Sequence, residues 1–152
     1  MRLIFCSRLA VDGRCGYIKT PEMDGRVTIF PSGKMISVGG KSIKKSIDQL
    51  NHAKFYLVRE NMINDTKLKP ITQNIVATVD VGQKLSLARL SSKIPRAIYN
   101  PKIFPGMILK GLNSCNFLIF ASGKIVMTGA KSLEEVNRSI FELFQKLDKF
   151  LD

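Results

Sequence analysis

Residues 29–42 read IFPSGKMISVGGKS, and residues 119–132 read IFASGKIVMTGAKS. The second stretch begins 90 residues after the first, and more than half of the aligned positions are identical. A match of this length indicates that one structural unit occurs twice in the chain. In each copy a Ser-Gly pair joins two short apolar segments, a setting typical of a tight hairpin turn in which glycine supplies a positive φ.

A helix is expected to follow each hairpin. In the second copy Ser132-Leu-Glu-Glu135 forms a capping box, in which the serine accepts a free backbone N–H and the glutamate reaches back. We expect the helix that follows to pack on its own sheet, with a partner-binding helix as the alternative. Its apolar side chains recur at helical spacing as Leu133, Val136, Ile140, Leu143, Phe144, Leu147 and Leu151.

The helix of the first copy is predicted to be shorter, from about Ser42 to Ala53. Its apolar positions, Ile43, Ile47 and Leu50, are expected to face inward, and the rest of the segment is rich in lysine. Another helix is predicted over residues 86–94, ahead of a loop over residues 99–105.

Alternating apolar residues predict strands over residues 74–81, 116–120 and 124–128. One face of these strands is wholly apolar and is expected to pack on the helices. The opposite face would be polar if it met only water, and a contiguous exposed apolar surface usually marks binding. That face is instead apolar in its middle and cationic at its edge, because it carries lysines around Val76, Leu118, Phe120 and Val126.

The two copies are unequal in length. Periodicity is lost after residue 60, so we predict a truncated first repeat over residues 1–60, a connector over 61–72 and a complete second repeat over 73–152. Only about 28 residues precede the first hairpin. The first repeat therefore lacks most of its opening strand and helix, unless residues 3–8 supply a substitute strand.

The composition points to an anionic partner. The chain has 152 residues, 45% of them hydrophobic, and a net charge of +12. It can bury a sizeable core, and its charge makes nucleic acid or an anionic membrane surface the first candidate partner. No apolar run approaches the roughly 20 residues of a membrane helix, and the start is too short for a signal peptide. We expect a soluble intracellular protein.

The residues that usually carry catalysis or bind metals are few. There are three cysteines, Cys6, Cys15 and Cys115, and one histidine, His52. A zinc site needs four clustered Cys or His ligands, and a Ser–His or Cys–His arrangement would rest on one histidine alone. We therefore expect buried spectator thiols, an exposed His52, no metal, no cofactor and no enzyme activity.

Four segments together resemble a known family. These are NIVATVDVGQKL, YNPKIFPGMILK, FLIFASGKIVMTGAKS and SIFELFQKLDKFLD, and they are similar to the core of the TATA-box-binding protein family. The resemblance covers nearly all of residues 71–152 and, more weakly, about 15–56. It implies an α+β saddle of two imperfect repeats, in which a curved antiparallel sheet carries helices on its convex face.

The resemblance also implies a DNA-binding role for the underside of the sheet. In this family the sheet lies on a widened minor groove, and pairs of phenylalanines insert between base steps. By similarity, the second repeat would contact DNA through the wedge pair Phe104 and Phe120, the polar readers Asn74 and Thr128, the apolar Val76, Leu118 and Val126, and the backbone-facing Lys110 and Lys124. Ordinary core packing is the alternative for the two phenylalanines.

The first repeat departs from the family pattern. By similarity it retains the wedge Phe30, the cations Lys19 and Lys34, and the groove contact Ile36. The partner phenylalanine falls near Gly13, where no aromatic residue stands, while Val38 and Thr28 replace the counterparts of Thr128 and Leu118. We therefore expect this half to kink DNA weakly or not at all.

The resemblance implies a general transcription initiation factor. Such a protein would bind and bend A·T-rich (TATA) promoter DNA and nucleate the preinitiation complex with the B-type factor and the RNA polymerase machinery. Asn100-Pro101-Lys102 stands where the family often has acidic residues that meet the B-type factor. A regulator that binds transcription factors, or a module with non-specific DNA affinity, is the alternative.

Assembly and location follow from the resemblance alone. A homodimer in the absence of DNA is one expectation. The charge and the YNPK-type loop favour a eukaryotic-like lineage, with an archaeal one as the alternative. The protein would then act in the nucleus or in the archaeal cytoplasm and nucleoid.

Overall fold

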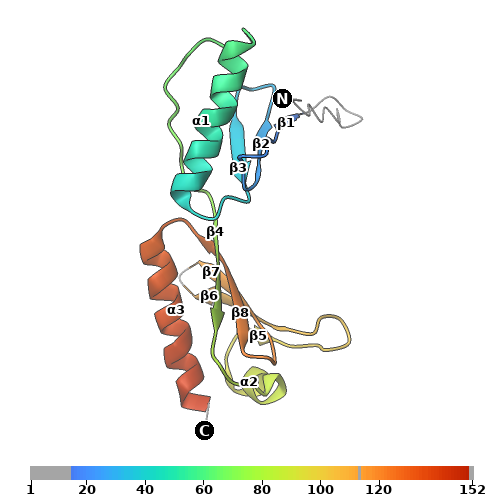
Figure 1. The fold of residues 1–152 in the computed structure, drawn as a ribbon. Coiled ribbons are helices and arrows are strands. Elements are labelled where there is room, and N and C mark those ends of the chain that lie inside the picture. The colour runs from blue at the N-terminus through green and yellow to red at the C-terminus, as the bar shows by residue number, and fades with distance from the viewer. Residues whose placement is uncertain (1–14, 113, 151–152) are drawn as a thin grey trace. The chain divides into compact units, whose positions relative to one another are not determined.

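The computed structural model describes residues 15–112 and 114–150. The chain divides into two compact units, Met1–Ile71 and Thr72–Asp152, and each contains an antiparallel sheet with a long helix along one face (Figure 1). The expected substitute strand at residues 3–8, the position of Gly13 and the thiol of Cys6 lie outside the described residues.

The first unit is built around the first copy of the repeated motif. Its sheet has the order β1-β2-β3 and is followed by one helix. The predicted hairpin is confirmed, because the Phe30 N–H donates to the Lys34 carbonyl and the Gly33 N–H to the Phe30 carbonyl, each at 2.9 Å. Gly33 has the expected positive φ of 79°. The elements are β1 (Gly16–Ile18), β2 (Arg26–Ile29), β3 (Met35–Val38) and α1 (Ile43–Arg59).

Helix α1 is longer than predicted. Its buried side is formed by Gln49, Ala53, Tyr56 and Leu57, whereas Ile43 is exposed and not inward as expected. Burial of Tyr56 and Leu57 continues the helix past Ala53. The end is set by Asn61, whose left-handed φ of 55° allows the N–H of the next residue to reach back to the Leu57 carbonyl.

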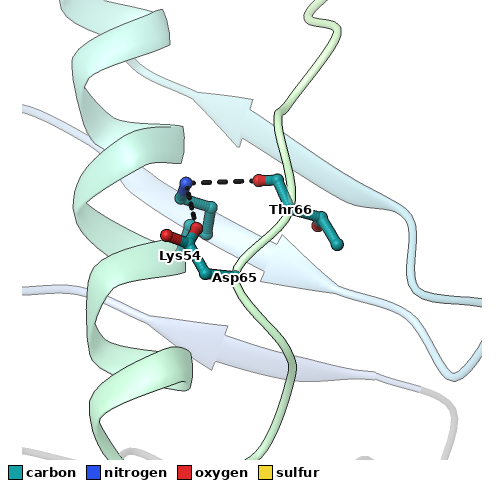
Figure 2. A network of polar contacts seen from close by, with 3 residues as sticks. All are labelled: Lys54, Asp65 and Thr66. Carbon is teal, nitrogen blue, oxygen red and sulfur yellow. Dashed lines mark hydrogen bonds and ion pairs between the residues drawn. The ribbon is translucent and has the colours of Figure 1, made fainter.

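The chain after α1 is held against the helix by one lysine. Lys54 Nζ donates to Asp65 Oδ1 at 2.7 Å and to the Thr66 carbonyl at 3.2 Å, as Figure 2 shows. The Lys54 side chain is only 23% exposed. This contact orders part of the segment that the sequence predicts as a connector.

A buried amide joins α1 to the loop before β2 and to strand β3. Gln49 Oε1 accepts from the Gly25 N–H at 2.6 Å, and its Nε2 donates to Ser37 Oγ at 2.8 Å. At the other side of the same loop His52 Nε2 lies 3.2 Å from Thr20 Oγ1. His52 is therefore partly buried and bonded, and not simply exposed as expected.

Gln49→Ala is expected to lower the free energy of unfolding of the first unit by about 1–3 kcal/mol, because two partly buried polar groups lose their partner. Gln145→Ala is the matched control. Gln145 is an exposed glutamine of the other long helix, and its change should stay within about 0.5 kcal/mol. Urea unfolding of the full chain measures both, and equal values for the two variants would contradict the prediction.

The second unit is the more complete one. Its five-stranded sheet has the order β4-β8-β7-β6-β5. Among the described residues the first unit has no counterpart of β4, α2 or β5. The elements are β4 (Ile75–Asp80), α2 (Leu87–Lys93), β5 (Ala97–Ile98), β6 (Met107–Leu112), β7 (Cys115–Ile119), β8 (Lys124–Ala130), α3 (Leu133–Leu147) and a 3-10 turn (Asp148–Phe150).

Helix α3 begins at the predicted capping box. Ser132 Oγ accepts from the Glu135 N–H at 3.1 Å, and the Glu135 carboxylate accepts from the Lys131 N–H at 2.7 Å. The predicted inward stripe is largely confirmed, since Val136, Leu143 and Leu147 are buried. Leu133 is an exception, since it is 63% exposed in the first turn of the helix, and the predicted Leu151 lies outside the described residues.

The core of the second unit lies between its sheet and its helices. Cys115 is wholly buried there and its sulfur accepts a hydrogen bond from Ser139 Oγ at 3.3 Å. The largest wholly buried side chains of this core are Phe117, Met107, Leu109, Ile119, Ile125, Met127, Leu143 and Leu147.

None of the helices within residues 15–112 and 114–150 has the length and apolar character that a membrane crossing requires.

Candidate nucleic-acid interface

The face of each sheet that lies opposite its long helix is called here the open face. In the second unit strand register brings side chains from all five strands into one row on this face. The row is mostly apolar, and the side chains at its middle are only partly buried. Its members, in order across the sheet, are Thr78, Val126, Leu118, Ile108 and Ile98.

Two apolar members of this row were not anticipated from the sequence. Ile98 is 53% exposed, and Ile108 is paired with Leu118. The run from Met107 to Leu109 is apolar at every position, so its alternation cannot be seen in the sequence. The structure separates the two faces, because Met107 and Leu109 are buried while Ile108 is not.

A pair of aromatic rings lies at one end of the open face of the second unit. The rings of Phe104 and Phe120 pack edge to face, with centroids 5.9 Å apart and planes at 61°. Neither ring is among the side chains that form the core of the unit, and both are partly exposed. Phe104 is held by a turn in which the Asn100 carbonyl accepts the N–H groups of Ile103 and Phe104 at 3.0 Å.

Gly106 makes room for this ring pair. A Cβ atom at Gly106 would lie 2.7 Å from the Phe104 ring and 3.2 Å from the Phe120 ring. Any side chain there would push the rings apart or off the sheet. The sequence interpretation missed Gly106, because nothing in the linear pattern shows that two rings converge on it.

Asn74 stands at an irregularity of the sheet beside the row. Strand register shifts between Ile75 and Ala77, and Gly129 opposite has a φ of 108°. Asn74 Oδ1 accepts from the Gly129 N–H at 2.8 Å. Because an N–H group can bond only to the amide oxygen, the orientation of the amide is determined, and its NH₂ group points away from Gly129.

The remaining predicted residues of the second unit surround these features. Thr128 pairs with Asn116 across the β7–β8 ladder and is partly buried, and Val76 is 57% exposed. Lys110 and Lys124 are both exposed. The structure therefore brings the nine predicted side chains of the second repeat to one sheet and the loops next to it.

The open face of the first unit is more polar. Tyr17, Thr28 and Ile36 form its row by register, and the Arg26–Val38 pair forms the next. The Arg26 guanidinium lies 5.0 Å from the centre of the Tyr17 ring. The pKa of the Tyr17 phenol is raised above its ordinary value, chiefly by its hydrogen bond with the Cys15 thiol. The predicted Phe30 is partly buried, and Lys19, Lys34 and Ile36 are exposed.

The described residues provide little for metal chemistry. No group of three or more His, Cys, Asp or Glu side chains within residues 15–112 and 114–150 is arranged to hold a metal ion. The features that distinguish the open faces are aromatic rings, apolar rows, amides and cations. These are groups that contact bases and phosphates.

Comparisons with known proteins agree with this picture. Residues 69–150 match the family model described as "Transcription factor TFIID (or TATA-binding protein, TBP)". A TATA-box-binding protein of Cenarchaeum symbiosum (strain A) is 57% identical over 136 residues, which are 90% of this chain and 75% of that protein. TATA-box-binding protein-like 1 of Entamoeba histolytica is 34% identical over 78% of this chain and 56% of its own length.

The fold agrees as well. The solved structure of Methanococcus jannaschii TBP matches 89% of this chain and 78% of its own, with a TM-score of 0.80 and 25% identity. The predicted α+β fold class is thereby confirmed. The chain belongs to the transcription factor TFIID, or TATA-binding protein, family.

Proposed function

We propose that this protein binds A·T-rich (TATA) promoter DNA through the minor groove, bends it and nucleates the preinitiation complex. The observation that carries the proposal is the Phe104–Phe120 pair, packed over Gly106 beside the apolar row. Two rings that are partly exposed and excluded from the core are well suited to insert between bases. Unstacked base faces need an apolar cover, and such insertion bends the duplex.

The middle of the open face would read the floor of the groove. The minor groove of A·T pairs offers only acceptors, adenine N3 and thymine O2. The amide of Asn74 suits them, because its oxygen is already bonded to Gly129 and its NH₂ group remains to donate. Thr128 supplies a hydroxyl nearby on β8, and Val76, Leu118 and Val126 supply apolar contacts.

The cations would contact the backbone. Lys110 and Lys124 in the second unit, and Lys19 and Lys34 in the first, are exposed. Phosphate contacts of this kind make affinity depend on salt but carry no sequence information. Phe30 and Ile36 would extend the apolar contact to the first unit.

The partners of the complex belong to the same proposal. The turn at Asn100–Lys102 is exposed and would meet the B-type factor without the acidic residues usual in the family. RNA polymerase would then join the complex after that factor. A second copy would cover the open faces when DNA is absent. Relatives such as those of Cenarchaeum and Pyrococcus horikoshii are archaeal, which favours action at the archaeal nucleoid over the eukaryotic-like lineage expected from the charge and the loop.

A second candidate function is a regulator that binds transcription factors. Large apolar side chains on the helices favour it, because Phe55 is 59% exposed and Leu133 and Phe141 are each 63% exposed. These side chains face away from the sheets. The two functions can therefore coexist in one molecule, and DNA bending decides whether the first is present.

The test compares a TATA-containing duplex with a scrambled G·C-rich duplex of equal length at about 150 mM salt. Gel shift measures affinity, and fluorescence energy transfer between the duplex ends measures bending. We expect tighter and bent binding of the TATA duplex, because the minor groove and deformable TA steps favour it. Equal and unbent binding of both duplexes would reject the proposal.

A further inference from the structure

Strand register allows the two open faces to be compared position by position. Tyr17 pairs with Thr28 in the first unit as Ile108 pairs with Leu118 in the second. Two residues before these positions stand Cys15 and Gly106. On the partner strand, Arg26 lies two residues before Thr28, as Asn116 lies two residues before Leu118. Arg26 therefore occupies the position of Asn116.

The first unit differs from the second at the place of the ring pair. Gly106 must lack a Cβ because both rings occupy that space. Cys15 has a side chain at the matching position, and its sulfur donates to the Tyr17 hydroxyl at 3.3 Å. The first unit therefore does not offer the space that a ring pair uses in the second.

The two units also differ in charge. The middle of the second unit's open face carries an isoleucine and an amide, Ile108 and Asn116. The first unit carries Tyr17 and Arg26 at the same register positions, with the guanidinium over the ring. Arg26 is exposed and lies opposite Val38, and Thr28 and Ile36 form the adjacent row. A flat cation held against an aromatic face loses little side-chain freedom when it binds an anion.

We propose that the two units hold DNA by different means, and that the first unit does so through Arg26, which contacts a backbone phosphate and is positioned by Tyr17. This rests on the proposed function. The second unit inserts a ring pair, whereas the first adds a cation at the position that Asn116 has in the second unit. Arg26 is then a DNA-binding residue and Tyr17 a positioning residue.

The test measures the affinity of the full chain for the TATA duplex between about 50 and 300 mM salt. Each phosphate contact contributes about −0.9 to the slope of log K against log salt. We expect Arg26→Asn, which installs the residue of the second unit, to reduce the slope by about one. Affinity at about 150 mM should fall roughly fivefold, and the bend of the bound duplex should not change.

Arg59→Asn is the matched control. Arg59 also lies over a tyrosine ring, 4.7 Å from the centre of Tyr56, but it belongs to α1 on the other side of the first sheet. Arg59→Asn removes the same charge, but at a position away from the open face. The slope of this variant should therefore equal that of the parent. An unchanged slope in Arg26→Asn, or an equal reduction in Arg59→Asn, would overturn the proposal.

Variants of Tyr17 test the positioning role. Tyr17→Phe keeps the ring under the guanidinium and should retain the parent slope, whereas Tyr17→Ala should lower the affinity without altering the bend. A Tyr17→Phe protein as weak as Tyr17→Ala would reject that role. Circular dichroism and urea unfolding establish that each variant is folded.

If the parent itself neither prefers nor bends the TATA duplex, the proposed function fails. If it does both and Arg26→Asn behaves like the parent, only this inference fails.

Discussion

Replacement of both Phe104 and Phe120 by alanine is expected to abolish bending of an A·T-rich duplex and to weaken its binding roughly a hundredfold. Contact between a base and an aromatic ring is worth roughly 1–3 kcal/mol, and two rings are removed. The rings lie outside the core, so the protein should remain folded. Energy transfer between labelled duplex ends measures the bend, and titration measures the affinity.

Two further variants control this experiment. Phe30→Ala removes the wedge proposed for the first unit and should leave most of the bend, since Phe30 has no ring partner like the 5.9 Å pair of the second unit among the described residues. Gly106→Ala keeps both rings but should reduce the bend, because the added Cβ would lie 2.7 Å from Phe104. A double alanine variant that still bends the duplex like the parent would rule out the wedge.

Phe117→Ala is expected to lower the free energy of unfolding of the second unit by about 3–5 kcal/mol. Phe117 is the largest of the wholly buried side chains, and its removal leaves a cavity as well as a loss of apolar burial. Urea unfolding of the full chain measures the change. Leu118 of the open face directly follows Phe117 on strand β7. DNA binding should therefore weaken in parallel, because the strand loses its support from the core.

Phe141→Ala is the matched control for core packing. Phe141 is also an aromatic residue of the second unit, but it is 63% exposed on α3. Its loss should change the free energy of unfolding by no more than about 0.5 kcal/mol. A cost below about 1 kcal/mol for Phe117→Ala would contradict the core described for this unit.

The sequence predicted much of the local structure because that structure depends on short-range rules. The Ser-Gly hairpins, the capping box at Ser132 and the alternation along β4, β7 and β8 each depend on neighbouring residues. Helix α1 was predicted to end too early, because its end depends on burial of Tyr56 and Leu57 and on the left-handed conformation of Asn61.

The candidate site was predicted in part. Resemblance supplied the phenylalanines, Asn74 and the lysines as expectations, whose DNA contacts remain predictions. It did not supply Ile98, Ile108, Gly106 or Arg26. The reason is that each of these depends on a neighbour distant in sequence or on strand register, which no local pattern encodes.

By itself, the sequence determined that one motif occurs twice, and it predicted a complete second repeat and a truncated first one, because the repeated motif and its spacing are written in the order of residues. Only the tertiary structure decided which side chains share a face: that two rings meet over Gly106, and that Arg26 lies on Tyr17. Strand pairing places residues side by side that are far apart along the chain, and a shift of one residue would move every side chain to the other face.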